Sequence, residues 1–292
     1  MVSPMELTSV ASPALWAGFL VFVLAMLALD LGVFHKKSHV VGFREAAAWS
    51  AVWIALACAF GGVVLWQFGP GLATEFFTGY LIEKSLSVDN IFVFVVIFAA
   101  FQVPAMHQHR VLFWGVLGAL VMRAVMIFAG GALLARFHWL IYVFGAFLVL
   151  TGVKLLRQQG KEPDLEKSWF MRAVRAVIPA TDKHDGEKFF TRENGKRLAT
   201  PLFMALVLVE LTDLVFALDS IPAIFAITRD PFIVFTSNIF AILGLRSLYF
   251  LLAGVMDRFV YLKTGLAAVL VFVGLKMALI DVIKLPAMVS LL

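Results

Sequence analysis

The stretch EKSLSVDNIFVFVVIF, Glu83–Phe98, decides how the rest of the chain is interpreted. It is apolar enough for a helix inside a lipid bilayer, yet it carries Glu83, Asp89 and Asn90. A charged side chain at the bilayer centre costs at least about 2.5–3.5 kcal/mol. The acids therefore predict protonation, a counter-charge or a bound cation in this part of the protein.

The composition supports a membrane setting for this stretch. Of 292 residues, 62% are apolar and only 15% are charged, which indicates a membrane protein. The single cysteine, Cys58, excludes a disulfide within the given chain. Because the first Lys or Arg is Lys36, we expect the N-terminal apolar segment to be a retained span and not a cleaved leader.

Apolar segments of about 20 residues predict an all-α polytopic protein with about eight transmembrane helices, in which residues 1–292 form a single transmembrane domain. The predicted spans are Ala14–Phe34, Ala46–Trp66, Thr74–Phe101, Val111–Leu134, His138–Leu156, Pro201–Ile227, Phe232–Met256 and Val260–Ile283.

The placement of basic residues predicts the orientation. The long loop between the fifth and sixth spans, residues 157–199, contains ten Lys and Arg residues, so the positive-inside rule places it in the cytoplasm and the N-terminus outside. Within it, Asp164–Ala180 has the pattern of an amphipathic helix. This helix would lie on anionic lipid or pack as a tether on the membrane domain. We expect a multi-pass protein of a bacterial-type inner membrane.

The chain repeats itself in a defined order. The motif containing Glu83, Asp89 and Asn90 recurs 130 residues later as DLVFALDSIPAIF, with Asp213, Asp219 and Ser220 at the matching positions. Arg123 in the fourth span is matched by Arg246 in the seventh, and the segment from Phe137 resembles the segment from Phe259. Spans three to five therefore repeat as spans six to eight. An odd number of spans per copy predicts a 3+3 inverted-topology repeat, an arrangement typical of secondary transporters.

The intramembrane acids predict a cation site. Five ionised acids, namely Glu83, Asp89, Glu210, Asp213 and Asp219, would cost on the order of 10–17 kcal/mol at the bilayer centre. Positions six apart do not share a helix face, so the two acids of the first copy form two stations along a path or the helix loosens between them. In the second copy, Pro222 cannot donate to the carbonyl of Leu218, which predicts a loosened segment.

Carboxylates, an amide and hydroxyls are hard oxygen ligands, which suit Mg²⁺, Ca²⁺ or Mn²⁺. The predicted ligands are Glu83, Asp89, Asn90, Glu210, Asp213, Asp219 and Ser220. Asn238 and Thr212 are candidates for further polar lining, and Arg123 and Arg246 for counter-charges or gates. The alternative for both arginines is snorkelling toward lipid headgroups.

The motifs EKSLSVDNIFVF and VELTDLVFALDSIPA, separated by a basic loop, resemble the TerC family of integral membrane proteins. The resemblance implies a manganese exporter related to LysE-type exporters and an association with tellurium-resistance gene clusters. It also implies that the two acidic motifs form the site. The preference for manganese comes from the resemblance, because the ligand chemistry alone indicates only a hard divalent cation.

The leading hypothesis is a secondary transporter that exports Mn²⁺ from the cytoplasm by alternating access, coupled to protons. We expect no enzymatic activity, no bound cofactor and no nucleic-acid partner. The alternatives are a Ca²⁺ or Na⁺-coupled exchanger and a membrane scaffold of a metal or tellurium stress response. An intramembrane aspartyl protease is disfavoured, because the Gly-x-Gly-Asp signature is absent from the sequence.

Overall fold

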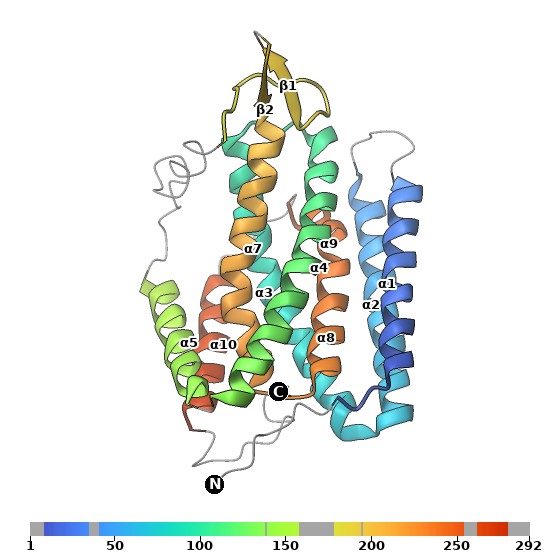
Figure 1. Ribbon diagram of the computed structural model, residues 1–292, viewed down its shortest axis with the longest axis vertical. Coiled ribbons are helices and arrows are strands. Elements are labelled where there is room, and N and C mark those ends of the chain that lie inside the picture. The colour runs from blue at the N-terminus through green and yellow to red at the C-terminus, as the bar shows by residue number, and fades with distance from the viewer. Residues whose placement is uncertain are drawn as a thin grey trace.

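The computed structural model describes residues 9–34, 41–137, 139–157, 178–193, 195–253 and 262–279, and within these ranges the chain is mostly helical (Figure 1). The helices are α1 Pro13–Phe34, α2 Phe43–Phe68, α3 Pro70–Ala100, α4 Ala105–Arg136, α5 Leu140–Arg157, α7 Pro201–Phe225, α8 Pro231–Leu243, α9 Leu245–Ala253 and α10 Leu262–Ala278. Two short strands, β1 Phe190–Glu193 and β2 Lys196–Ala199, precede α7.

Several helices have the length and composition of membrane spans. Helix α2, the segment Ala105–Leu133 of α4, and α7 each qualify alone, and the bent pair α8–α9 adds a fourth span if it is counted as one. A membrane protein is thereby confirmed. The predicted segments fall on α1 to α5, α7, the α8–α9 pair and α10, but the count of eight spans stays a prediction.

The helices bend in a different place from the one predicted. Helix α3 runs unbroken through Glu83 and Asp89, so the loosened alternative for this segment is wrong. Helix α7 likewise continues past Pro222 and ends at Phe225, one turn later. The break lies instead at Gly244, where α8 and α9 meet at an angle of 41°.

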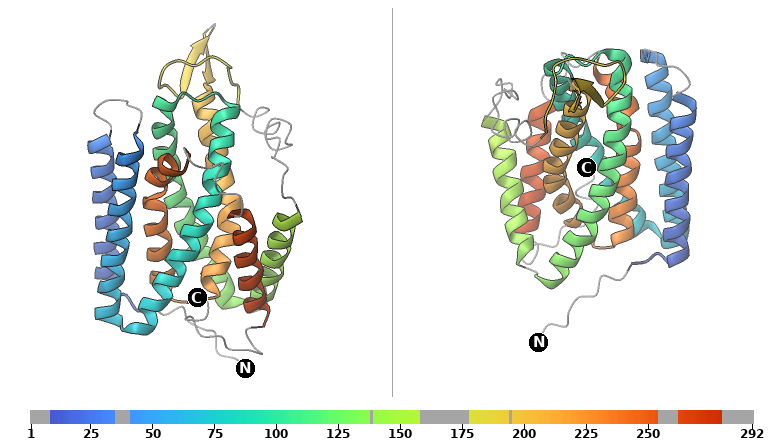
Figure 2. Two further views of the ribbon diagram at one scale, coloured as in Figure 1. Left: turned by 180° about the vertical axis from the view of Figure 1, so that it is seen from behind. Right: turned by 45° about the horizontal axis from the view of Figure 1, so that its top comes forward.

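Aromatic side chains hold the first helix against the bundle. Trp16 and Phe19 of α1 pack on Phe232 and Phe235 of α8, with ring centroids 5.1 to 6.0 Å apart. Phe60 of α2 extends the same cluster. Such tilted and edge-to-face contacts are favourable beyond the burial of area alone. They attach α1 and α2 to one side of the bundle (Figures 1 and 2).

The remaining helices pack in a paired pattern. Helix α3 packs on α8 and α4 packs on α7, while α5 and α10 form a close pair on the side of the bundle opposite α1 and α2 (Figure 2). Exchanging α3 with α7, α4 with α8 and α5 with α10 leaves this set of neighbours unchanged. The site described below lies where α3, α4, α7 and α8 meet.

The mostly helical fold contains one segment of another kind, because strands β1 and β2 pair antiparallel as a hairpin at one end of the bundle. Its turn contains Gly195, whose φ of +78° favours glycine. The dipeptide Asn194–Gly195 is a typical hairpin signal in the sequence. The predicted amphipathic helix falls on residues 164–180, of which 164–177 lie outside the described residues.

The loop before the hairpin is attached to the start of α4. Arg110 contacts Glu187 with an N–O distance of 3.3 Å, and its guanidinium lies 5.1 Å from the centre of the Phe189 ring. Within the loop, hydrogen bonds from Lys188 and Thr191 hold the pKa of the Asp185 carboxyl below its usual value. The loop and hairpin therefore form an ordered polar layer at this end of the bundle.

Asp230 caps the N-terminus of α8. Its carboxylate accepts hydrogen bonds from the amides of Phe232 and Ile233, at 2.9 and 3.0 Å, and from the amide of Val10 at 2.6 Å. We expect Asp230→Ala to lower the free energy of unfolding by about 1–2 kcal/mol, because these amides lose their acceptor. Asp230→Asn keeps an oxygen acceptor and should cost less. Denaturation of the purified proteins in detergent measures the difference, and equal losses for the two variants would contradict the capping role.

Candidate functional site

A fully buried arginine joins acids from the two copies of the acidic motif. Arg123 of α4 is 0% exposed. Its Nη1 atom contacts the carboxylate of Glu83 on α3. Its Nε and Nη2 atoms donate to both oxygens of Asp213 on α7, at 3.1 and 2.8 Å. The two acids occupy matching positions of the repeat, so one guanidinium connects both copies.

Two amide side chains complete this network. Asn238 of α8 accepts a hydrogen bond from Arg123 at 3.2 Å and donates to Glu83 at 3.1 Å. Asn90 of α3 donates to Asp213 at 3.4 Å. Both amides are buried. We call Glu83, Asn90, Arg123, Asp213 and Asn238 the polar network.

The charges of the polar network explain why it can exist inside an apolar bundle. Isolated buried charges are very costly, and a buried ion pair offsets that cost only with good geometry and further hydrogen bonds. Here one guanidinium faces two carboxylates, one of them by a bidentate contact. With Glu83 and Asp213 both ionised, the network keeps a formal charge of −1. Of the three predicted compensations, namely protonation, a counter-charge and a bound cation, Arg123 supplies the counter-charge for Glu83 and Asp213.

Buried oxygen atoms without a partner lie on α3 and α7, the helices that carry the two acids. The hydroxyls of Ser87 and Ser220 and the side-chain oxygen of Asn90 have no hydrogen-bond partner in the part of the chain that the structure describes. These residues are at most 1% exposed. Buried polar groups are normally paired, so such oxygens are suited to a ligand or water. Asn90 and Ser220 occupy matching positions of the two motif copies.

Among the predicted ligands, Glu83, Asn90 and Asp213 meet in the polar network. Among the described residues, no group of three or more His, Cys, Asp or Glu could hold a metal ion. Arg123 lies between the two acids of the polar network, and the side chains of Asp89 and Asp219 lie outside the described part. The metal site therefore stays a prediction.

Glu210 and Thr212 precede Asp213 on α7, and Glu210 lies within range of the Asp213 charge. The carboxylate of Glu210 lies against Gly118 of α4, where an added Cβ would be 2.0 Å from one of its oxygens. It borders an apolar groove between α4 and α7 whose walls include the exposed side chains Trp114 and Val121. Thr212 donates to carbonyls of its own helix, those of Leu208 and Val209. Arg246, the other predicted counter-charge, is buried on α9.

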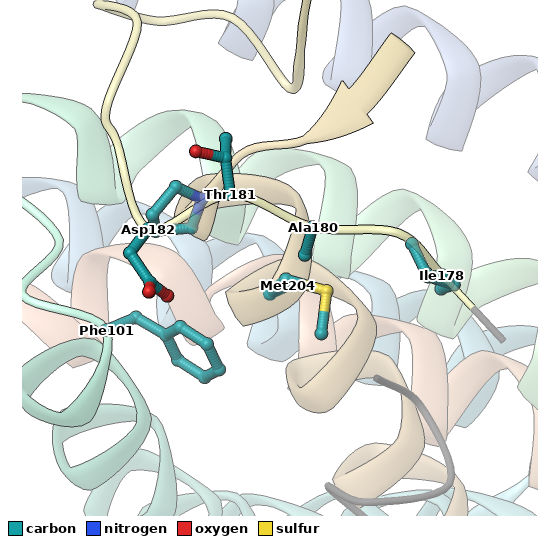
Figure 3. A pocket seen from close by; sticks show the side chains of 7 residues that line it. Phe101, Ile178, Ala180, Thr181, Asp182 and Met204 are labelled. Atoms are coloured by element: carbon teal, nitrogen blue, oxygen red, sulfur yellow. The ribbon is translucent and has the colours of Figure 1, made fainter. Parts of the chain in front are cut away.

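A cavity of about 150 Å³ lies at the N-terminal end of α7, under the hairpin (Figure 3). Asp182 is the one acid in its lining, which otherwise includes Phe101 and Met204. A single exposed carboxylate beside apolar side chains lacks the donor set of a cation site. This cavity therefore belongs to the packing of the loop on the bundle.

Comparison with known proteins places this geometry in a family. Residues 68–292 match the model of the integral membrane protein TerC family. The chain belongs to the TerC family. A Myxococcus xanthus relative, "Uncharacterized membrane protein STKORF319", is 68% identical, with 97% of this chain and 89% of the relative covered.

Of two further relatives, one has a name that suggests a function and the other does not. "Putative membrane-bound redox modulator Alx" of Escherichia coli K12 is 50% identical, with 98% of this chain and 92% of the relative covered. An "Uncharacterized membrane protein" of Rickettsia bellii is 45% identical, with 94% and 91% covered. No solved structure matches the chain.

All members of the polar network are recognisable in the sequence, but the contacts among them are not. Glu83, Asn90, Asp213, Asn238 and Arg123 were all singled out as polar residues in apolar segments. The sequence did not reveal that one arginine would bridge both acids. The Nζ atom of Lys84, next to Glu83, donates to the carbonyl of Ala241 near the end of α8.

Proposed function

We propose that this TerC-family protein exports Mn²⁺, or a closely similar hard divalent cation, from the cytoplasm by alternating access. The observation that carries the proposal is the buried polar network, in which acids from two motif copies meet around one arginine. A purely structural network would be better replaced by apolar side chains, since buried ion pairs seldom add net stability. The presence of the network therefore favours a role in binding charge.

The proposed architecture is the 3+3 inverted repeat of spans three to five and six to eight within eight spans. The exchange pattern of helix neighbours supports it, because each contact between copies has a counterpart after the copies are swapped. In such transporters the site lies at the interface of the repeats. The polar network occupies the interface of α3, α4 and α7 with α8. We further propose that the loop faces the cytoplasm, where its basic residues contact anionic lipid.

The proposed cation ligands are the oxygens of Asp89, Asn90, Asp219 and Ser220, with Glu83 and Asp213 released to them when Arg123 moves aside. Hard oxygen donors fit Mn²⁺ and Ca²⁺. Arg123 then acts as a resident counter-cation, which holds both acids ionised between transport events. Protons would drive the cycle, because the same carboxylates release metal when they become protonated. Glu210, three residues before Asp213 on α7, is a further proposed ligand.

The Alx name raises redox modulation as another function. A dithiol–disulfide cycle within one chain needs two cysteines, and the given sequence has one, the exposed Cys58. We therefore favour cation transport over thiol chemistry within the chain. Changes in cellular redox state would follow indirectly from altered metal content.

The experiment measures cellular manganese by elemental analysis in manganese-loaded cells. Cells expressing the wild type should contain severalfold less manganese than cells with an empty vector. Asp89→Asn/Asp219→Asn should abolish the difference, because the acids of both copies lose their charge. Asp89 and Asp219 are replaced instead of Glu83 and Asp213, because Glu83 and Asp213 contact Arg123.

Asp182→Asn, which removes an exposed carboxylate from the loop before the hairpin, is the matched control and should export normally. Equal membrane abundance of all variants must be established by blotting. If wild type, double variant and empty vector give the same manganese content, manganese export is wrong. The same assay with calcium then tests the exchanger alternative, and retention of partners by the double variant tests the scaffold alternative.

A further inference from the structure

The break between α8 and α9 creates a buried helix end inside the bundle. Helix α8 ends at Leu243, Gly244 forms the cap, and α9 starts at Leu245 after a bend of 41°. The last carbonyls of a helix have no intrahelical partner and carry the negative end of the helix dipole. In transporters with broken spans, such ends coordinate a coupling Na⁺.

In this protein an ammonium group occupies that end. The Nζ atom of Lys84, on α3, donates a hydrogen bond to the carbonyl of Ala241 at 3.2 Å. In an unbroken helix this carbonyl would accept from the amide of Leu245. A Cβ added at Gly244 would lie 3.0 Å from Nζ and 3.0 Å from Trp53. The ammonium is therefore packed directly against the break.

Lys84 follows Glu83 of the polar network in the sequence, but its side chain contacts a different partner. Glu83, the preceding residue, faces Arg123 and Asn238, whereas Lys84 faces the α8 carbonyl end. Asn238 lies three residues before Ala241 on the same helix. The site thus contains two resident cations, a guanidinium on the acids and an ammonium on the helix end.

We propose that Lys84 is a tethered cation that fills the monovalent-cation position of the broken span, so that the protein needs no Na⁺. A lysine ammonium is a compact point charge, and at a helix end it meets the same carbonyl field as a bound ion. Removing the ammonium leaves carbonyls at the break without their cation. The vacated position then binds Na⁺ from solution. Lys84 is a positioning residue in this scheme and does not contact the transported ion.

The test compares thermal unfolding of purified protein in NaCl and in choline chloride at equal ionic strength. The wild type should unfold at the same temperature in both salts. Lys84→Met should unfold at a lower temperature in choline chloride and regain at least about 2 °C in NaCl, because Na⁺ binds only the folded state. Lys84→Arg keeps a fixed cation and should show no difference between the salts.

Lys188→Met, which removes an exposed lysine from the loop before the hairpin, controls for the loss of one positive charge. If Lys84→Met does not fold, Lys84→Gln takes its place with the same expectation, since it also lacks the charge. A wild type stabilised by Na⁺ over choline overturns the proposal. So does a neutral variant that responds to Na⁺ no more than Lys84→Arg does.

A second readout rests on the proposed export function. Manganese export by the wild type should be equal in sodium-containing and sodium-free media, whereas Lys84→Met should export only with sodium. If the wild type exports no manganese in either medium, the proposed function fails. The thermal measurement does not depend on manganese, so it still decides the role of Lys84.

Discussion

Replacing Arg123 with methionine is expected to lower the free energy of unfolding by about 3–5 kcal/mol, because two buried carboxylates then lose their counter-charge. Arg123 is completely buried, and its guanidinium contacts Glu83 and Asp213 together with Asn238. The substitution therefore removes buried charge-assisted contacts to three side chains at once. Denaturation of the purified variants in detergent measures the loss.

Two comparisons separate the buried charge from the loss of an arginine. Arg110, on the same helix, pairs with Glu187 at 3.3 Å, but its side chain is 34% exposed. Arg110→Met should therefore cost less than about 1 kcal/mol, as expected for an exposed pair. Equal losses for Arg110→Met and Arg123→Met would contradict the interpretation of the polar network.

The acids themselves provide the second comparison. Combining Arg123→Met with Glu83→Gln and Asp213→Asn removes all three formal charges from the polar network. The triple variant should be more stable than Arg123→Met alone, since it leaves no uncompensated buried carboxylate. If the additional substitutions lower stability further, the acids are held by contacts other than Arg123.

Gly274→Ala is expected to lower the free energy of unfolding by about 1–3 kcal/mol, because overpacking at a close helix crossing forces the backbones apart. A Cβ at Gly274 of α10 would lie 2.7 Å from the backbone oxygen of Gly145 and 2.9 Å from the backbone nitrogen of Val149, both on α5. Backbone atoms cannot rotate away as side chains can. Small residues at membrane helix interfaces allow this close approach.

Gly62→Ala is the matched control in α2. Nothing lies within 4 Å of a Cβ added at Gly62, so alanine there should be neutral or stabilise the helix by up to about 1 kcal/mol. Opposite signs for the two substitutions would establish the close α5–α10 contact. Equal effects would mean that the two helices pack less closely than the structure gives.

Several features of the fold were predictable from the sequence because they depend on local pattern. Apolar length predicted the segments that became α1 to α5, α7 and α10. The acids of both motif copies stood out because charge is rare in such segments. The Asn194–Gly195 signal of the hairpin is also a local feature of the sequence.

The position of the helix break could not be predicted from local signals. Pro222 is a strong helix breaker, yet α7 continues past it to Phe225. Gly244 lies in an apolar segment without proline, and α8 ends there. Packing decides between the two positions, since Trp53 and the Lys84 ammonium both lie against Gly244. These neighbours come from other helices.

The sequence by itself determined that the chain is a membrane protein with two related acidic motifs, because hydropathy and repeated residue order are properties of the chain alone. Only the tertiary structure decided which charges meet. Glu83, Arg123 and Asp213 are 40 and 90 residues apart along the chain, and Lys84 is 157 residues from the carbonyl to which it donates. Electrostatic pairing acts over a few ångströms, so it depends on which helix faces are brought together, and hydropathy does not encode that.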